Sequence, residues 1–102
     1  MNKSDKIYIA GHKGMVGSSI EGLLLSLGYN NILTATSKEL DLVNQQRVKD
    51  FFEHHKPEYV ILAAAKVGGI GANMKYSAQF IYDNLMIQTN VIHQSYVSKV
   101  KK

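Results

Sequence analysis

The sequence predicts an α/β fold in which helices cover both faces of a parallel sheet. Apolar runs typical of strands alternate along the chain with amphipathic stretches typical of helices. Glycines at positions 11, 14 and 17 join the first apolar run to the first amphipathic stretch. The run at 59–65 has almost no polar interruption, which is typical of a strand buried on both faces. Together these features indicate the N-terminal half of a doubly wound, Rossmann-like sheet with strand order 3-2-1-4.

The first half of the chain predicts a strand, a helix and a second strand. We expect the first strand at 6–10 and the first helix at 14–27. The apolar side chains of this helix recur at helical spacing: Met15, Val16, Ile20, Leu23, Leu24 and Leu27. Gly28 follows, where a helix C-terminus favours a left-handed residue. The second strand is expected at 32–36, and the segment 39–42 is expected to form an abbreviated third strand.

The second half predicts a helix at 44–55, which Pro57 ends, and then the apolar strand at 59–65. A glycine-rich loop at 66–73 leads into a long helix at 77–99. Helical crossovers of this kind impose parallel strands and right-handed connections.

The apolar strand has the character of a central strand, yet it would lie at an edge if the sheet ended with it. A long apolar edge invites aggregation, and the long helix usually leads to a further parallel strand. We therefore expect residues 1–102 to be an incomplete Rossmann domain, with its next strands and a substrate domain absent from this chain.

Composition narrows the class of protein. The 102 residues suffice for one domain, and 45% of them are hydrophobic. Because there is no cysteine, thiolate chemistry and disulfides are excluded, which fits a reducing compartment. No apolar run reaches the roughly 20 residues of a membrane span, and the polar N-terminus differs from a signal peptide, so we expect a cytoplasmic protein. The net charge of +4 comes from scattered lysines without an aromatic-basic signature, so we expect neither a nucleic-acid partner nor a metal site.

The strand–glycine–helix segment predicts a dinucleotide site. A glycine turn before a helix places bare backbone N–H groups where they can hold a pyrophosphate. The glycines are spaced G-x-x-G-x-x-G rather than G-x-G-x-x-G, and glycines also mark ordinary turns, so the flanking strand and helix carry the prediction. The expected cofactor-binding residues of this loop are Gly11, His12, Lys13, Gly14, Met15, Val16 and Gly17.

The end of the second strand predicts which dinucleotide binds. About 20 positions beyond the glycine loop, an acid would hold a ribose 2′-OH and a basic residue would accommodate a 2′-phosphate. This chain has Ser37 and Lys38 there, and Lys13 lies in the loop, which favours NADP(H) over NAD(H). Glu39 weakens that preference, and the alternative for Lys38 is a solvated turn lysine.

Two further segments are candidates for the same site. Asp41 and Leu42 are predicted to contact the adenine, although either Asp41 or Asn44 would also cap the following helix. At the carboxyl end of the apolar strand, small side chains let a cofactor approach the backbone, or simply allow helix–sheet packing. These small residues are Ala63, Ala64 and Ala65.

Five segments of the chain resemble one family closely. They are residues 11–18, 39–42, 56–60, 62–70 and 80–92, and the Ala-Ala-Ala-Lys-Val-Gly-Gly-Ile string is the most specific of them. In these segments the chain resembles the GDP-L-fucose synthases, which are extended short-chain dehydrogenase/reductases. Members of that family epimerise C3 and C5 of GDP-4-keto-6-deoxy-D-mannose and then reduce C4 with NADPH. The resemblance implies an NADP-dependent oxidoreductase and epimerase of nucleotide-sugar biosynthesis.

The resemblance also implies roles by position. It assigns residues 11–17 to the pyrophosphate, residues 37–42 to the adenosine half, and the three alanines to the ribose and nicotinamide side. It implies a loop near the GDP-sugar that contains Lys66, Val67, Gly68 and Gly69. The family often has arginine where Ser37 and Lys13 stand, and lysine keeps the charge but loses the bidentate fork.

The family's catalytic serine, cysteine, tyrosine and lysine come later than the last residue of this chain, so the chain alone is expected to be inactive. Tyr96 and Lys99 have the spacing Tyr-x-x-Lys instead of Tyr-x-x-x-Lys and are expected to be ordinary helix residues. The alternative functions are a non-catalytic nucleotide-binding or subunit-interaction module, or another sugar-nucleotide epimerase of the same superfamily.

In related reductases the long helix packs against its twin in a dimer. The resemblance therefore implies a homodimer through a second face of this helix, which carries Tyr82, Met86, Ile87 and Asn90. The alternative is that this face is buried against another part of the same protein.

Overall fold

The structure is a computed structural model that describes residues 2–64 and 74–101. Strands and helices alternate along this part of the chain. The elements are β1 (Ile7–Ala10), α1 (Met15–Ser26), β2 (Ile32–Leu33), α2 (Gln45–His55), β3 (Tyr59–Leu62) and α3 (Met74–Val97). The predicted glycine-rich loop at 66–73, with Ala65, lies outside the described residues.

The three described strands form one parallel sheet in the order β2-β1-β3. Ile7 pairs with Ile32 on one side and with Tyr59 on the other, so β1 is the central strand. All four residues of β1 are buried, as expected for a central parallel strand. The four residues of β3 are only half-buried, because β3 has a single neighbour in the described sheet. The predicted burial of this strand on both faces is therefore wrong for the described structure.

The expected strand at 39–42 is also wrong. This segment consists of turns, in which the N–H groups of Glu39 and Leu40 donate to the Thr36 carbonyl at 3.0 and 2.8 Å. The Asn44 N–H then donates to the Asp41 carbonyl at 3.0 Å. Because these backbone groups find partners locally, the segment has no need of a neighbouring strand. The expected order 3-2-1-4 counted the segment 39–42 as strand 3, so its fourth strand is β3. The observed order β2-β1-β3 is therefore the 2-1-4 part of the expected order.

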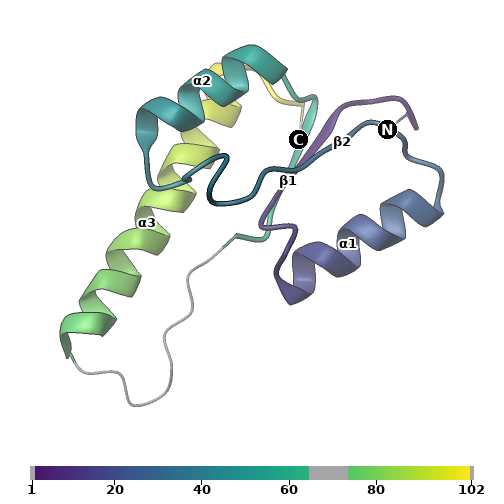
Figure 1. Ribbon diagram of the computed structural model, residues 1–102. Coiled ribbons are helices and arrows are strands. Elements are labelled where there is room, and N and C mark those ends of the chain that lie inside the picture. Colours follow the sequence, from purple (N-terminus) through teal and green to yellow (C-terminus); the bar gives the residue numbers. More distant parts are fainter. Residues whose placement is uncertain (1, 65–73, 102) are drawn as a thin grey trace.

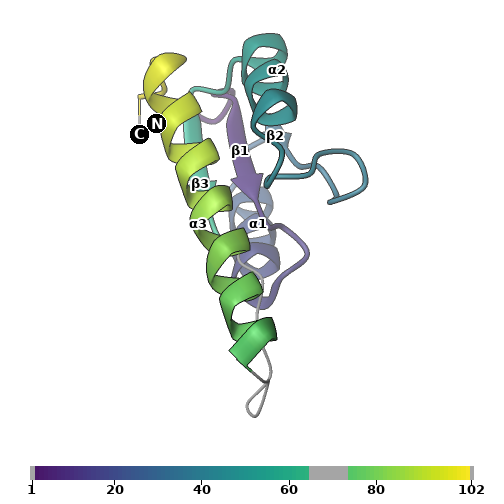
Figure 2. The same cartoon turned by 90° about the vertical axis from the view of Figure 1, so that its left-hand side faces the viewer.

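Helices cover both faces of the sheet, with α1 on one face and α2 and α3 on the other (Figure 1, Figure 2). Alternate residues of β1 contact the two layers, as the two-residue period of a strand requires. Tyr8 lies in the core beneath α2 and α3, where it meets Phe52 and Val91. Ile7 and Ile9 form the smaller core beneath α1 with Leu24 and the half-buried Ile20.

The bounds of α1 are close to those predicted, but its apolar stripe is mostly exposed. Leu24 is buried, whereas Met15 is 88% and Leu23 is 59% exposed. The strand beneath α1 is only four residues long and presents only Ile7 and Ile9 to this helix. The described sheet is therefore too small to cover the whole stripe.

The prediction of a dimer face with Tyr82, Met86, Ile87 and Asn90 on one side of α3 is wrong for two of these residues. Ile87 and Asn90 are 4% and 3% exposed, so both lie on the inner side of the helix and not on an outer face. The outer side carries exposed apolar residues: Ile81, Tyr82, Leu85, Ile92 and Tyr96. Across residues 2–64 and 74–101, no helix has the length and apolar character needed to span a membrane.

Candidate functional site

The glycine loop is a tight turn between β1 and α1. Gly11 has a φ of +92°, which favours glycine, and a Cβ there would lie 2.6 Å from the Ala64 Cα. A Cβ at Gly17 would lie 2.0 Å from the Gly11 carbonyl oxygen. At Gly14 the same Cβ would make an ordinary contact of 3.5 Å. Gly11 and Gly17 are therefore required for the first turn of α1 to pack directly on the loop, and for the loop to pack on the end of β3.

The start of α1 presents backbone donors that have no acceptor among the described residues. Gly14 is the N-cap residue and makes no side-chain cap, and the first turn contains no acidic residue. Ser18 donates its N–H to the Gly14 carbonyl at 2.8 Å, so the three earlier N–H groups of the helix have no acceptor within it. These groups belong to Met15, Val16 and Gly17. Together with the helix dipole they form an end that favours an anion.

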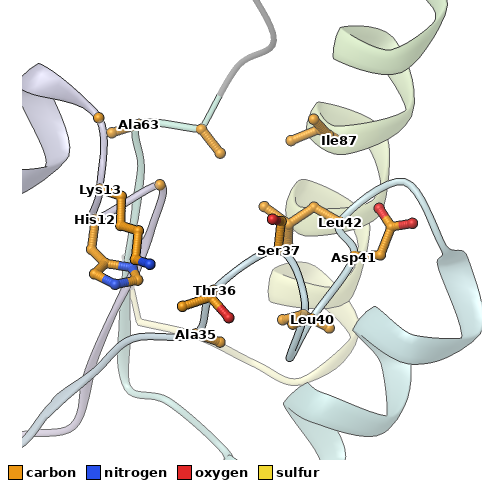
Figure 3. Close-up of a pocket in the computed structure, with 13 residues that line it drawn as sticks. His12, Lys13, Ala35, Thr36, Ser37, Leu40, Asp41, Leu42, Ala63 and Ile87 are labelled. Atoms are coloured by element: carbon orange, nitrogen blue, oxygen red, sulfur yellow. The ribbon is translucent and has the colours of Figure 1, made fainter.

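A cavity of about 380 Å³ opens at the carboxyl ends of the strands, beside this helix end (Figure 3). Its size falls within the range of small-molecule sites, and ligands of open α/β sheets bind at this end. The lining comes from the glycine loop, the segment after β2, the turn before α2, the end of β3, and α3. The lining residues are Gly11, His12, Lys13, Gly14, Ala35, Thr36, Ser37, Leu40, Asp41, Leu42, Ala63, Ala64 and Ile87.

Most of the residues predicted for the cofactor therefore come together around one cavity. Met15, Val16 and Gly17 do not line it, and they contribute the helix end instead. Lys38 is exposed and does not line it. Ala65, Lys66, Val67, Gly68 and Gly69 lie outside the described residues.

Three lining residues were not predicted: Ala35, Thr36 and Ile87. Leu40 also lines the cavity and lies within the segment 37–42 that the resemblance assigns to the adenosine half. The small residues Ala35 and Thr36 follow β2 much as Ala63 and Ala64 follow β3, so the same reasoning at a strand's carboxyl end would have found them. The local sequence carries no such signal for Ile87, because only the packing of α3 brings it to the cavity.

A reciprocal pair of hydrogen bonds fixes the cavity wall after β2. The Thr36 N–H donates to Glu39 Oε1 at 3.0 Å, and the Glu39 N–H lies 3.3 Å from Thr36 Oγ1. Arg47 Nη2 donates to the Glu39 carbonyl at 2.7 Å. The hydrogen bond from the Thr36 backbone is the main cause that lowers the pKa of Glu39, followed by the Thr36 side chain and the nearby His12 and Lys13. The turn that carries Ser37 is thus held at the cavity with an ionised carboxylate behind it.

The structure decides whether Asp41 or Asn44 caps α2. The Asn44 side chain caps α2 by accepting from the Arg47 N–H at 3.1 Å, so Asp41 is not the cap. Asp41 Oδ1 instead accepts from the Val43 N–H at 3.1 Å, which closes a local turn at the cavity. Contact between Asp41 and an adenine stays a prediction.

The cavity fits a nucleotide cofactor chemically. Leu40, Leu42 and Ile87 supply apolar wall on one side, and Lys13 brings a cation beside the helix end on the other (Figure 3). His12 also lines the cavity, and its Nδ1 is buried without a hydrogen-bond partner among the described residues. Backbone donors, a cation and an apolar slot suit phosphate groups and an aromatic base.

Comparison with known proteins agrees with this chemistry. The chain is 56% identical over its whole length to "Putative GDP-L-fucose synthase 2" of Arabidopsis thaliana, of which it covers 31%. It is 46% identical over 95% of its length to the GDP-L-fucose synthase of Escherichia coli K12, of which it covers 30%. The chain thus spans about a third of the length of the curated relatives it matches.

The fold is shared with solved reductases of nucleotide sugars. A GDP-D-glycero-L-gluco-heptose synthase of Campylobacter jejuni, solved in the presence of NADPH, superposes with a TM-score of 0.94 at 53% identity. That match covers all of this chain and 30% of the other. The profile described as "NAD dependent epimerase/dehydratase family" matches residues 7–102, which include the glycine loop and every described strand. The chain therefore belongs to the NAD dependent epimerase/dehydratase family.

Proposed function

We propose that this chain is the cofactor-binding part of an NADPH-dependent enzyme that converts GDP-4-keto-6-deoxy-D-mannose to GDP-L-fucose. The observation that carries the proposal is the cavity at the strand ends, to which four of the five segments that resemble GDP-L-fucose synthases contribute lining residues. The identity of 56% and 46% to two such synthases supports it. Bound NADPH would supply the hydride that reduces C4 of the sugar.

The proposed roles follow the geometry for the residues that line the cavity or begin α1, and they follow the resemblance for Lys38 and residues 65–69. The free N–H groups at the start of α1 hold the pyrophosphate. Asp41 and Leu42 hold the adenine, while Lys13, Ser37 and Lys38 bind the 2′-phosphate. The resemblance assigns the alanines after β3 to the ribose and nicotinamide, and the loop from Lys66 to Gly69 to the GDP-sugar. The groups that transfer protons are proposed to lie in the part of the protein that this chain does not include.

The test is a reductase assay on the whole natural gene product that contains these residues. We expect it to consume NADPH when GDP-4-keto-6-deoxy-D-mannose is present. Lys13→Ala removes the cation that lines the cavity, so it should raise the KM for NADPH by about tenfold and leave the KM for NADH nearly unchanged. Lys49→Ala, an exposed lysine on α2 away from the cavity, is the control. Absence of NADPH consumption would contradict the proposed reaction.

A second candidate differs only in the sugar. The identity of 53% and the TM-score of 0.94 to the Campylobacter jejuni GDP-D-glycero-L-gluco-heptose synthase favour a GDP-heptose in place of the GDP-deoxyhexose. Assays of both GDP-sugars at equal concentration distinguish the two candidates through their kcat/KM values.

We also propose that the protein is a homodimer that uses the outer face of α3. Support comes from Tyr82, Leu85 and Ile92 on that face, each more than half exposed. The alternative occupant is another part of the same protein. A cytoplasmic location stays a prediction, which cell fractionation would test.

A further inference from the structure

Asn90 links α3 to the turn that precedes α2. Its Nδ2 amide group donates to the Leu42 carbonyl at 2.8 Å and to the Val43 carbonyl at 3.1 Å. The two hydrogens of one amide group therefore satisfy two carbonyls that neither a helix nor a strand contains. The residue is 3% exposed, so its side-chain amide has little access to water in place of these bonds.

The turn that Asn90 holds, which contains Leu42 and Val43, forms part of the cavity wall. Leu42 and the adjacent Asp41 line the cavity, and both lie in the turn whose carbonyls Asn90 holds. Ile87 lies on the same inner side of α3 and lines the cavity as well (Figure 3). One face of α3 thus supplies part of the wall and fixes the position of another part. Asn90 itself does not line the cavity.

Leu42 packs against the core that contains Val91, but few of the hydrogen bonds among the described residues fix the position of this turn. The Asp41 side chain accepts from the Val43 N–H, and the Asn44 N–H donates to the Asp41 carbonyl, so both bonds are local. They shape the turn without attaching it to the rest of the molecule. The bonds from Asn90 join it to a helix 47 and 48 positions further along the chain. Without them, two part-buried carbonyls lose their partner and the turn gains alternative positions.

We propose that Asn90 is a positioning residue that holds the Leu42 turn in its binding-competent place and thereby sets affinity for the adenosine half of the cofactor. The proposal rests on the proposed function in that the ligand is NADPH. A turn that occupies the competent position only part of the time lowers the apparent affinity by that fraction. Asn90 does so without contact to the ligand.

The test compares variants of Asn90 with one control in the whole gene product. Asn90→Ala removes both donors, and Asn90→Asp keeps the shape but sets carboxylate oxygens against two carbonyls. Val91→Ala is the control, because Val91 is 1% exposed and packs in the core next to Asn90 without bonding to the turn. Two ligands are titrated into each protein: NADPH, and 2′,5′-ADP, which contains only the adenosine half.

Both Asn90 variants should raise the Kd for NADPH and for 2′,5′-ADP by the same factor, about tenfold. Val91→Ala should lower the unfolding midpoint and leave both Kd values unchanged. A Kd within twofold of wild type in Asn90→Ala, or an equal rise in Val91→Ala, overturns the proposal.

Hydrogen exchange tests separately whether the hydrogen bonds of Asn90, which we call the clamp, hold the turn in place. In the wild-type protein without ligand, the side-chain amide hydrogens of Asn90 should exchange slowly. This measurement needs no variant. In Asn90→Ala the backbone amides of Val43 and Asn44 should exchange faster, while the amide of Ile9 in β1 keeps its rate. Rapid exchange of the Asn90 side chain, or unchanged rates at Val43 and Asn44, overturns the clamp. A wild-type protein that binds neither ligand overturns the proposed function, and the exchange rates then still decide the clamp.

Discussion

Gly17 and Gly22 lie on the same helix, but a side chain would meet different surroundings at the two positions. A Cβ at Gly17 would lie 2.0 Å from the Gly11 carbonyl oxygen, which belongs to the backbone and cannot give way cheaply. A Cβ at Gly22 would meet no atom within 4 Å. The glycine at 17 is thus required by packing, whereas the glycine at 22 only weakens the helix.

The same substitution should therefore have opposite effects at the two glycines. Gly17→Ala is expected to lower the free energy of unfolding by about 1–3 kcal/mol, because the loop and α1 must move apart. Gly22→Ala is expected to raise it by about 0.5–1 kcal/mol, because alanine is the better helix former. Urea unfolding of the whole gene product measures both. An equal rise in stability for the two variants would refute the close packing of the glycine loop.

His55 gives a pH dependence at the scale of one residue. Its ring lies 4.5 Å from the Phe51 ring, and burial is the main cause that lowers its pKa, followed by the charges of His54 and Lys6. Because the folded state favours the neutral ring, the unfolded chain takes up the proton first, near its ordinary pKa of about 6.5. The contribution of His55 is present above that pH and is lost as the pH falls through the lower, folded pKa.

The free energy of unfolding should accordingly decrease as the pH falls below about 6.5. His55→Gln should make that decrease shallower, since glutamine has no proton to gain. Urea titrations at a series of pH values measure the slope. The same slope in His55→Gln and in wild type would show that another group causes the dependence.

At the scale of the element, α2 begins and ends through identifiable residues. Asn44 caps its start, and its last turn is closed by the Lys56 N–H, which donates to the Phe52 carbonyl at 2.9 Å. Lys56 has a φ of 48°, in the left-handed region that disfavours a side chain, and Pro57 follows. The sequence predicted this end through Pro57, but it did not predict that a lysine adopts the left-handed conformation.

This geometry predicts opposite effects of glycine at Lys56, the C-cap residue of α2, and at Lys49 within the helix. Lys56→Gly should raise the free energy of unfolding by about 1 kcal/mol, because glycine adopts the left-handed conformation without strain. Lys49→Gly, at an exposed position inside the helix, should lower it by about 1 kcal/mol. Thermal unfolding of both variants gives the comparison, and a loss of stability in Lys56→Gly would contradict the description of this helix end.

At the scale of the whole molecule, the described residues expose apolar surface on two helices. The outer side of α3 carries Leu85, Ile92 and Tyr96, which are 58%, 60% and 83% exposed. The apolar stripe of α1 is also largely uncovered. Such a continuous face on one helix is typical of a surface that another chain or segment covers.

The proposed homodimer predicts a change of mass after substitution on α3. The double variant Leu85→Lys and Ile92→Lys should convert a dimer to a monomer, because burying two ammonium groups in an apolar interface is costly. Sedimentation or light scattering of the whole gene product measures the mass. The pair Ser19→Lys and Asn30→Lys adds the same charge at exposed positions outside α3 and should leave the dimer intact. A wild-type monomer would refute the dimer, and unfolding of the double variant in a monomer would favour coverage of α3 within the same protein.

Local sequence signals predicted most of the elements and much of the cavity. Periodicity gave α1, α2 and α3 to within a few residues, and the strand–glycine–helix order gave the loop around Gly11. The residues at the carboxyl ends of strands were predictable because parallel strands end at one edge of the sheet. The expected strand at 39–42 failed, because its apolar alternation was outweighed by the turns that Thr36, Asp41 and Asn44 close.

The sequence by itself determined what depends on neighbours along the chain: the helices, the glycine turn, and the family to which its motifs belong. Only the tertiary structure decided which side of α3 faces inward, and therefore that Ile87 lines the cavity and that Asn90 holds the turn at Leu42. The physical reason is that helical spacing places an apolar residue on a face, whereas contacts across nearly half the chain decide which face meets the sheet. The role proposed for Asn90 depends on such a contact. Its partners are two backbone carbonyls, which every residue has, so no residue type in the sequence marks them.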